Sequence, residues 1–396
     1  MNKTYKEPFL CMALLVLMIF EVPFLNLFLI AGLLMLLIYT LIYKRRPVVN
    51  GEMTVLLLFI ALYFILDSKL EQSNTYKFWY SISTVSLYMC GYYMNFGMLN
   101  KEERSAKLEN VIKIIAVTYT AYIFITVVYS TINGQFAITR NPLNLWTGML
   151  RAATHYGTMS IVPLAYGLWL VVIGETKKRK TQGWILIFFA VTVAIITASR
   201  TVIMLVPVGA IIAYFSSIKM RGEFTRRHVN QLIGALVFLG VGIATFVLDI
   251  FGIQTLFFRT QLGQRYVQGN APTLTEDGRW INILFFLENM DKSIWGGGYS
   301  RTNVGNLHNV YLNVFDLSGI IPFTLLVFFT ISILRDFLRM RRNGAVSVSA
   351  ELLMLLVLSL TFIQMLLEPT MESVPVFMWC VLLICGMQRK VSRCTQ

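Results

Sequence analysis

Long apolar runs recur along this sequence, and many of them match the thickness of the hydrocarbon core of a bilayer. A backbone inside lipid must satisfy its own hydrogen bonds, so such runs fold as helices unless short alternating segments indicate a closed barrel. The sequence has no alternating segments of that kind, and 56% of its residues are hydrophobic while 14% are charged. We therefore expect an all-α polytopic membrane protein rather than a soluble globular domain.

The hydropathy pattern predicts about twelve membrane spans. They are expected at residues 9–20, 24–43, 53–67, 78–98, 111–131, 157–173, 184–198, 201–216, 231–251, 310–334, 351–367 and 374–387. Most of the 34 Lys and Arg residues fall in alternate connections, which the positive-inside rule assigns to the cytoplasm. Both termini are therefore expected inside, and the net charge of +14 indicates orientation rather than nucleic-acid binding.

Residues 1–396 are expected to form one integral membrane domain with two long loops on the outer face, at 132–156 and 252–309. Long ordered loops in compact proteins are more often functional than decorative. These loops hold most of the basic residues that the orientation rule leaves unexplained, which are Arg140, Arg151, Arg259, Arg265, Arg279, Lys292 and Arg301. The clustering predicts an anionic partner at the outer face. The five Cys residues lack metal or disulfide spacing and are expected to serve packing.

The second loop contains a predicted helix and a glycine run. Large apolar side chains recur at helical spacing over residues 279–290, which predicts a short amphipathic helix in the membrane interface. Three consecutive glycines at 296–298 then predict a hinge that lets the loop close over a substrate. The chain enters its next span through His308 and Asn309.

Arg200 lies between two apolar runs, within the sequence SRT. It is either a snorkelling arginine that anchors a helix end or a ligand for phosphate, whose oxygens a guanidinium binds in pairs. A charge without a function would need a hydrated loop, and no such loop is expected at this turn. The position therefore favours the phosphate role.

His308 is one of only three histidines in the chain. It is either a structural residue at a helix start or a general base, because imidazole takes up a proton near neutral pH. Asn309 either orients a substrate hydroxyl or caps the helix. Asp316 is expected inside the following span, in a structural role. His155 is a weaker outer-face candidate, and His228 is expected to be solvated in a cytoplasmic loop.

Motifs for nucleotide, dinucleotide and metal binding are absent from the sequence, including the P-loop, the G-x-G-x-x-G pattern and H-E-x-x-H. We therefore expect neither a metal nor a cofactor. Without a nucleotide site, an activated substrate must arrive already energised. The arginines of the outer face then indicate a lipid-linked diphosphate donor.

Short motifs resemble, in order, those of the O-antigen polymerase and O-antigen ligase family. The sequence TASRT at 197–201 resembles the Ser-Arg turn of that family. A set of residues in the C-terminal part of this chain resembles the C-terminal signature of that family. The set comprises Arg279 with Trp280, the glycines at 296–298, HNVYL at 308–312, Asp316 and Gly319. Arg151, His155 and Gly157 of this chain resemble an Arg-Gly element in the earlier outer loop of that family.

This resemblance implies a GT-C-like glycosyltransferase of the bacterial inner membrane. Its donor would be a glycan on undecaprenyl diphosphate, and its reaction would be metal-free, inverting and periplasmic. His308 would activate the acceptor hydroxyl, and Arg200 and Arg279 would hold the diphosphate. Further diphosphate candidates are Arg151, Arg265 and Arg301, and candidates for contacting the acceptor or supporting the site are Asn309, Tyr311 and Asp316.

The acceptor distinguishes a polymerase, which extends another lipid-linked repeat unit, from a ligase, which modifies lipid A–core. The sequences SRT and HNVYL are closer to the polymerase versions. The expected partners are the lipid-linked oligosaccharide and membrane lipids, with a chain-length regulator protein as an open alternative. Two other classes also stay open. A flippase for the same glycan would usually show internal repeats, which are not seen here, and a scaffold would need no converging His and Arg residues.

Overall fold

The structure is a computed structural model that describes residues 9–43, 50–66, 74–221, 245, 247–260, 262–264 and 278–394. Every regular element within these ranges is a helix, which confirms the prediction of an all-helical chain for the described residues. Among the described residues, six spans are long and apolar enough to cross a membrane. They are α5 (Lys101–Ile132), α7 with α8 (Ala153–Met159 and Ile161–Ile173), α9 (Lys177–Ile196), α10 (Arg200–Arg221), α17 (Ile320–Arg342) and α18 (Val348–Leu367).

The other predicted spans correspond to shorter or less apolar helices. These are α1 (Phe9–Ile19), α2 (Leu27–Tyr43), α3 (Gly51–Leu66), α4 (Asn74–Tyr93) and α20 (Pro375–Ser392). The predicted span at 231–251 lies largely outside the described residues. The number twelve and the orientation of the chain stay predictions.

Short helices complete the described chain. They are η1 (Phe24–Asn26), α6 (Gln135–Ile138), η2 (Ile250–Gly252), α12 (Ile253–Arg259), α14 (Gly278–Glu288), η3 (Met290–Ser293), α15 (Tyr299–Asn303), α16 (Val310–Ser318) and α19 (Thr370–Ser373). Helix α14 confirms the helix predicted near 279–290, and Trp280, Ile281 and Leu284 are exposed on it.

The predicted span at 310–334 is wrong as a continuous helix. Gly319 stands between α16 and α17 with φ of 88° and ψ of −176°, so the helix breaks there. The membrane-length apolar helix begins only at Ile320. Asp316 therefore lies on the short helix before that span rather than inside the span.

The chain forms two compact units. Unit 1 comprises Met1–Tyr122, Leu274–Glu351 and Thr361–Gln396, and unit 2 comprises Ile123–Thr273 and Leu352–Leu360. Helices α5 and α18 contribute residues to both units.

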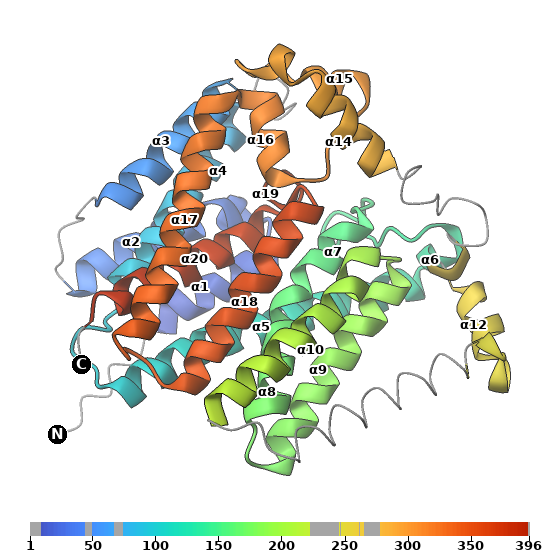
Figure 1. The fold of residues 1–396 in the computed structure, drawn as a ribbon, viewed down its shortest axis with the longest axis horizontal. Coiled ribbons are helices and arrows are strands. Elements are labelled where there is room, and N and C mark those ends of the chain that lie inside the picture. The colour runs from blue at the N-terminus through green and yellow to red at the C-terminus, as the bar shows by residue number, and fades with distance from the viewer. Residues whose placement is uncertain are drawn as a thin grey trace. The chain divides into compact units, whose positions relative to one another are not determined.

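Unit 1 is organised around α20, nearly every residue of which is buried. Helices α4 and α17 pack directly on α20, and α3 packs on α17 (Figure 1). The crossing of α4 and α20 is very close, because a Cβ at Gly386 would lie 2.0 Å from the Tyr88 carbonyl oxygen and one at Gly91 would lie 2.0 Å from that of Leu383. Small residues allow this approach, as is typical of packed helices in membranes.

Unit 2 uses the same principle. Helices α8 and α9 cross where Gly167 and Gly183 face each other, since a Cβ on either glycine would lie under 3.0 Å from the carbonyl oxygen of the other. Helix α10 packs against both of them. Gly209 on α10 also lies close to the side chain of Leu360, the last residue of the α18 segment in this unit.

Polar side chains fix several helix starts. The Asn50 side-chain oxygen accepts hydrogen bonds from the backbone amides of Glu52 and Met53 at the start of α3. The Ser347 hydroxyl accepts one from the backbone amide of Ala350 at the start of α18. Such caps satisfy amides that have no partner within the helix.

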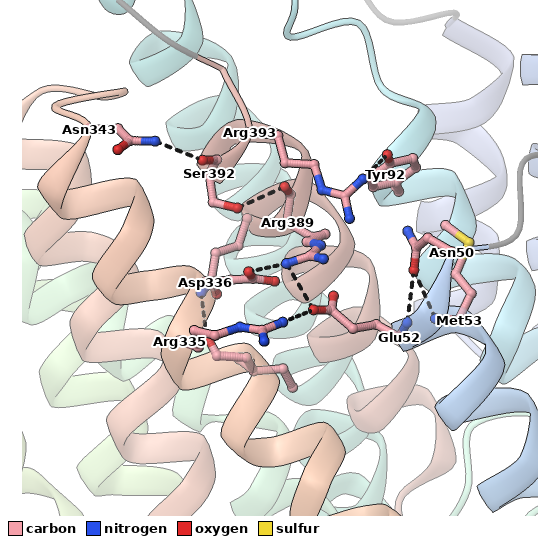
Figure 2. Close-up of polar contacts among 12 residues, drawn as sticks. Asn50, Glu52, Met53, Tyr92, Arg335, Asp336, Asn343, Arg389, Ser392 and Arg393 are labelled. Carbon is pink, nitrogen blue, oxygen red and sulfur yellow. Dashed lines mark hydrogen bonds and ion pairs between the residues drawn. The ribbon is translucent and has the colours of Figure 1, made fainter.

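A charged cluster joins three helices of unit 1, at the start of α3 and near the ends of α17 and α20 (Figure 2). Glu52 Oε1 lies 2.8 Å from both Arg335 Nη2 and Arg389 Nη1, and Arg389 also pairs with Asp336. The Tyr88 hydroxyl donates to Glu52 Oε2 at 3.2 Å. Two acidic and two basic side chains balance, and three of them are buried while Arg335 is 62% exposed.

We predict that Gly386→Ala prevents unit 1 from packing. The new methyl group would collide with a backbone carbonyl that has no rotamer through which to withdraw, at a cost of about 3 kcal/mol, the upper end of the usual range for overpacking. The measurement is the yield of monodisperse protein after detergent extraction, together with its apparent Tm. Gly97→Ala is the matched control, because Gly97 is exposed and a Cβ there meets nothing within 4 Å. Equal yields for the two variants would contradict the prediction.

Candidate active site

Two acids, the buried Glu368 and the partly buried Glu372, mark the break between α18 and α20. Helix α18 ends at Leu367, and Glu368 adopts an extended conformation with φ of −147° and ψ of 148°. Pro369 follows, and a residue before proline is driven out of the helical region, so the helix stops there. The short helix α19 then carries Glu372. Both carboxylates therefore lie on one short connection within unit 1.

Glu368 joins two residues that the sequence singles out. One of its carboxylate oxygens accepts from Arg279 Nη2 at 2.7 Å, and the other lies 3.4 Å from His308 Nδ1. The Glu368 side chain is only 4% exposed, whereas those of Arg279 and His308 are 29% and 34% exposed. The acid is thus held behind the arginine and the imidazole, which face outward.

A second pair of the same kind lies beside the first. Arg301 Nη1 donates to Glu372 Oε2 at 2.7 Å, and the Tyr63 hydroxyl donates to Glu372 Oε1 at 3.2 Å. The Arg301 side chain is 33% exposed and that of Glu372 is 11% exposed. Arg279, Arg301, His308, Glu368 and Glu372 constitute the candidate site.

The loop before α16 holds His308 in an unusual backbone conformation. Its φ of 52° lies in the left-handed region, which costs a non-glycine residue free energy and is common at functional sites. Asn313 fixes this loop from inside, because its side-chain oxygen accepts from the Leu307 amide and its side-chain nitrogen donates to Asn306. The Leu307 side chain is buried against Phe286 of α14.

Asn309 and Tyr311 lie close to the imidazole along the chain. The Asn309 side-chain oxygen accepts from the amides of Tyr311 and Leu312 and so caps α16, while its nitrogen donates to the Leu366 carbonyl. The Tyr311 hydroxyl donates to Thr330 at 3.0 Å, because the Thr330 proton is committed to the Leu326 carbonyl. Burial raises the pKa of the Tyr311 phenol, so it stays protonated at physiological pH.

Asp316 has a structural environment. It is 1% exposed, and its carboxylate accepts hydrogen bonds from the Ser293 hydroxyl at 2.6 Å and from the amides of Ser300 and Arg301 at 2.9 and 3.0 Å. The acid therefore secures the start of α15, which carries Arg301. These hydrogen bonds are those of a structural residue, the role expected for Asp316. The carboxylate supports the backbone of Arg301, a member of the second ion pair described above.

The interpretation of residues 296–298 as a hinge is wrong. All three glycines have positive φ, and the amides of Gly297 and Gly298 donate to the Leu317 and Asp316 carbonyls at 3.0 and 2.8 Å. A Cβ on Gly296 would lie 2.6 Å from the Leu317 carbonyl oxygen. Gly296 thus allows two backbones to touch, and the amides of Gly297 and Gly298 fasten the loop to the end of α16.

Unit 2 contains the remaining predicted residues that the structure describes. Helix α7 packs against the junction of α9 and α10, where Gly157 lies against the Ser199 side chain. This contact brings the segment of Arg151 and His155 beside the turn of Arg200. Arg151 is exposed, Arg200 is partly exposed, and His155 is buried against the Tyr156 ring.

Arg265 and His228 are outside the described residues. Arg259 ends α12 and is exposed, and Arg140 follows α6. Within the described ranges, no group of three or more His, Cys, Asp or Glu residues gathers in a way that could hold a metal ion.

Sequence reasoning did not select Glu368 or Glu372. A usable signal is present, since EPTME at 368–372 places two acids and a proline between two apolar runs. A charge that close to the membrane needs a partner or a wet surface. Only the structure identifies the partners as His308 and the two arginines.

No model of a known protein family matches this sequence, and no curated protein matches it either. The resemblance to O-antigen polymerases and ligases therefore stays a prediction that rests on the short motifs.

We predict that Asp316→Ala destabilises the region that carries the candidate site. The change leaves the buried Ser300 amide, the partly buried Arg301 amide and the buried Ser293 hydroxyl without their acceptor. The cost is about 1–3 kcal/mol for each buried group. Faster proteolysis or amide exchange over α15 measures the effect. Asp291→Ala is the control, because Asp291 is exposed on the neighbouring η3. The same protection in both variants would contradict the structural role of Asp316.

Proposed function

We propose that this chain is a membrane glycosyltransferase that polymerises a bacterial surface polysaccharide. It transfers a growing glycan from undecaprenyl diphosphate to a hydroxyl of another lipid-linked repeat unit, at the periplasmic face of the inner membrane. The proposal is supported by the ordered motifs of the sequence and by one observation above all. The buried Glu368 contacts both His308, the expected base, and Arg279, an expected diphosphate ligand.

The His308–Glu368 contact suits a general base. A carboxylate that accepts the Nδ1 proton fixes the imidazole tautomer and leaves Nε2 as the acceptor. The contact of 3.4 Å is long, as catalytic hydrogen bonds often are before substrate binds. His308 is partly exposed, so its Nε2 is the atom proposed to take the proton of the acceptor hydroxyl.

The two arginines suit a departing diphosphate. A guanidinium has five donors in a planar fork that suits phosphate oxygens, and the acid behind each arginine orients the group. Arg279 also donates from Nη1 to the Leu367 carbonyl at 3.3 Å, which fixes the fork further. Fixed donors of this kind stabilise the negative charge that develops as the glycosidic bond breaks. Arg279 and Arg301 are proposed for this role, with Arg200 and Arg151 of unit 2 as further candidates.

The proposed reaction is a single inverting displacement. The acceptor oxygen attacks the anomeric carbon of the donor glycan and loses its proton to His308 Nε2. The bond between that carbon and the diphosphate oxygen breaks, and its electron pair leaves on undecaprenyl diphosphate. The imidazolium that forms next to Glu368 is stabilised by the carboxylate until it returns the proton to water.

Purified protein with undecaprenyl-diphosphate repeat units provides the test of function. We predict a ladder of glycan products from repeat units alone, as a polymerase requires. Product that forms only when lipid A–core is added would indicate a ligase instead. Movement of the repeat unit across a vesicle membrane without any new glycosidic bond would contradict an enzyme and indicate a flippase.

We predict that His308→Ala lowers kcat by about 10²–10⁴-fold, the usual contribution of a general base. Glu368→Gln keeps the shape of the acid but removes the charge that orients the imidazole, so it should lower kcat less and shift the pH profile. Glu351→Gln is a matched control, because Glu351 pairs with Arg341 away from the site. Normal ladders from His308→Ala protein would contradict the base assignment.

We predict that Arg279→Lys raises KM for the lipid-linked donor and lowers kcat/KM by roughly tenfold or more. Lysine keeps the charge but loses the planar fork that binds two oxygens together. Arg259→Lys serves as the control, because Arg259 is exposed at the end of α12. Equal kinetics for both variants would exclude a paired phosphate contact at Arg279.

A further inference from the structure

One face of α17 is exposed along most of the helix. Ile321, Phe328, Ile331 and Leu338 are each at least 50% exposed, and at about 100° per residue they fall on one side. The opposite side is buried where α17 packs on α3 and α20. From Ile321 to Leu338 the helix rises about 26 Å, close to the thickness of the hydrocarbon core of a bilayer. This surface, called the α17 stripe, therefore suits contact with lipid chains.

The same face carries three arginines where the helix ends. Arg335, Arg339 and Arg342 follow Ile331 in steps of four, four and three residues, so they continue the α17 stripe. All three arginines are exposed. Within the described part of the chain, Arg339 and Arg342 form no ion pair, whereas Arg335 pairs with Glu52. The stripe thus ends in positive charge that the described residues leave largely uncompensated.

Two general effects account for basic residues at this helix end, but not for their placement. Arginines at a helix C-terminus interact favourably with its dipole, and basic connections orient a membrane chain. Neither effect requires the arginines to share a face with exposed apolar residues. Arg341, also in the last turn, lies off this face and pairs with Glu351 at 2.8 Å. The shared face is therefore the feature that a ligand explains.

An apolar stripe that ends in guanidinium groups matches the two parts of a phospholipid. Acyl chains can lie along Phe328 and Ile331, and the polar Thr324 on this face keeps its hydroxyl proton on the Ile320 carbonyl. Guanidinium groups bind phosphate oxygens in pairs, and basic groups beside membrane spans commonly bind anionic headgroups. A choline headgroup would cancel the phosphate charge, whereas a glycerol headgroup leaves it intact. Charge complementarity therefore selects an anionic lipid such as phosphatidylglycerol.

Arg335 connects this surface to the charged cluster. Its Nη2 donates to Glu52 Oε1 at 2.8 Å, and the same oxygen lies 2.8 Å from Arg389 Nη1. Glu52 is buried whereas Arg335 is exposed, and Figure 2 shows the Arg335 side chain reaching toward Glu52. A phosphate on the outer side of Arg335 would hold the guanidinium against this acid. The lipid would thereby stabilise the contact of α3, α17 and α20.

We propose that the α17 stripe binds one anionic glycerophospholipid, with its acyl chains along Phe328 and Ile331. Its phosphate is bound by Arg335, Arg339 and Arg342. The inference does not depend on the proposed function, because none of these residues belongs to the candidate site. By the orientation expected from the sequence, the lipid lies in the cytoplasmic leaflet. Its effect is to stabilise unit 1 through the charged cluster.

Native mass spectrometry of the full chain, together with its Tm in lipid nanodiscs, tests the site. We expect the protein to retain one phosphatidylglycerol in preference to phosphatidylcholine. Its Tm should be several degrees higher in nanodiscs that contain phosphatidylglycerol than in nanodiscs of phosphatidylcholine alone. No preference, or no rise in Tm, would overturn the proposal.

A charge-matched pair of variants separates this site from the net charge of the protein. The double variant Arg339→Gln with Arg342→Gln should bind phosphatidylglycerol roughly tenfold more weakly and lose the rise in Tm. The control is Lys177→Gln with Lys178→Gln, because both lysines are exposed at the start of α9. Equal loss of lipid affinity in the two variants would overturn the proposal, because any exposed cation would then serve.

Photocrosslinking of the unaltered protein distinguishes a bound lipid from the surrounding bilayer and from a free anion. The probe is phosphatidylglycerol with a diazirine in one acyl chain. We expect crosslinks to α17 peptides with Phe328 or Ile331, suppressed by excess phosphatidylglycerol but not by phosphatidylcholine or inorganic phosphate. Ile211, which is 56% exposed on α10, reports background contact with lipid.

Two outcomes of the crosslinking would overturn the proposal. Equal suppression at α17 and α10 would indicate ordinary bilayer lipid, and suppression by inorganic phosphate would indicate a site for free anions. If the double arginine variant does not fold, the crosslinks of the unaltered protein decide the question.

Discussion

The close crossing of α4 and α20 at Gly91 and Gly386 is the contact on which unit 1 depends. Helices in lipid gain little from hydrophobic burial, so their association relies on backbones that approach closely. With α20 buried along its length, its residues are available to neighbours on every side. The charged cluster and the connection that carries Glu372 are built on this helix or directly before it.

A carboxylate out of water is costly unless it is paired, and this cost gives the candidate site its form. Glu368 is nearly inaccessible and has two partners, an arginine and an imidazole, which are the residues that face outward. Glu372 repeats the arrangement with Arg301. The acids are less exposed than their partners, so the carboxylates hold Arg279, Arg301 and His308 from behind.

The helices of this chain follow from its sequence because their cause is local. An apolar run of membrane length must be helical, so α5, α9, α10 and α18 appear near their predicted positions. The errors arise where one residue depends on a distant backbone. The glycines at 296–298 predicted a mobile hinge, but their backbone is hydrogen-bonded to the end of α16. Gly319 breaks a helix that the hydropathy pattern predicted to be continuous.

The sequence by itself determined the helical class, the candidate imidazole and the arginines, because residue type and hydropathy are local properties. Only the tertiary structure decided that Glu368 lies between His308 and Arg279, since these residues are up to 89 positions apart. It also decided that charged side chains of α3, α17 and α20 pair with one another. Which residues become long-range partners depends on which helix faces pack together. The sequence pattern of one helix does not indicate which face of another helix packs against it.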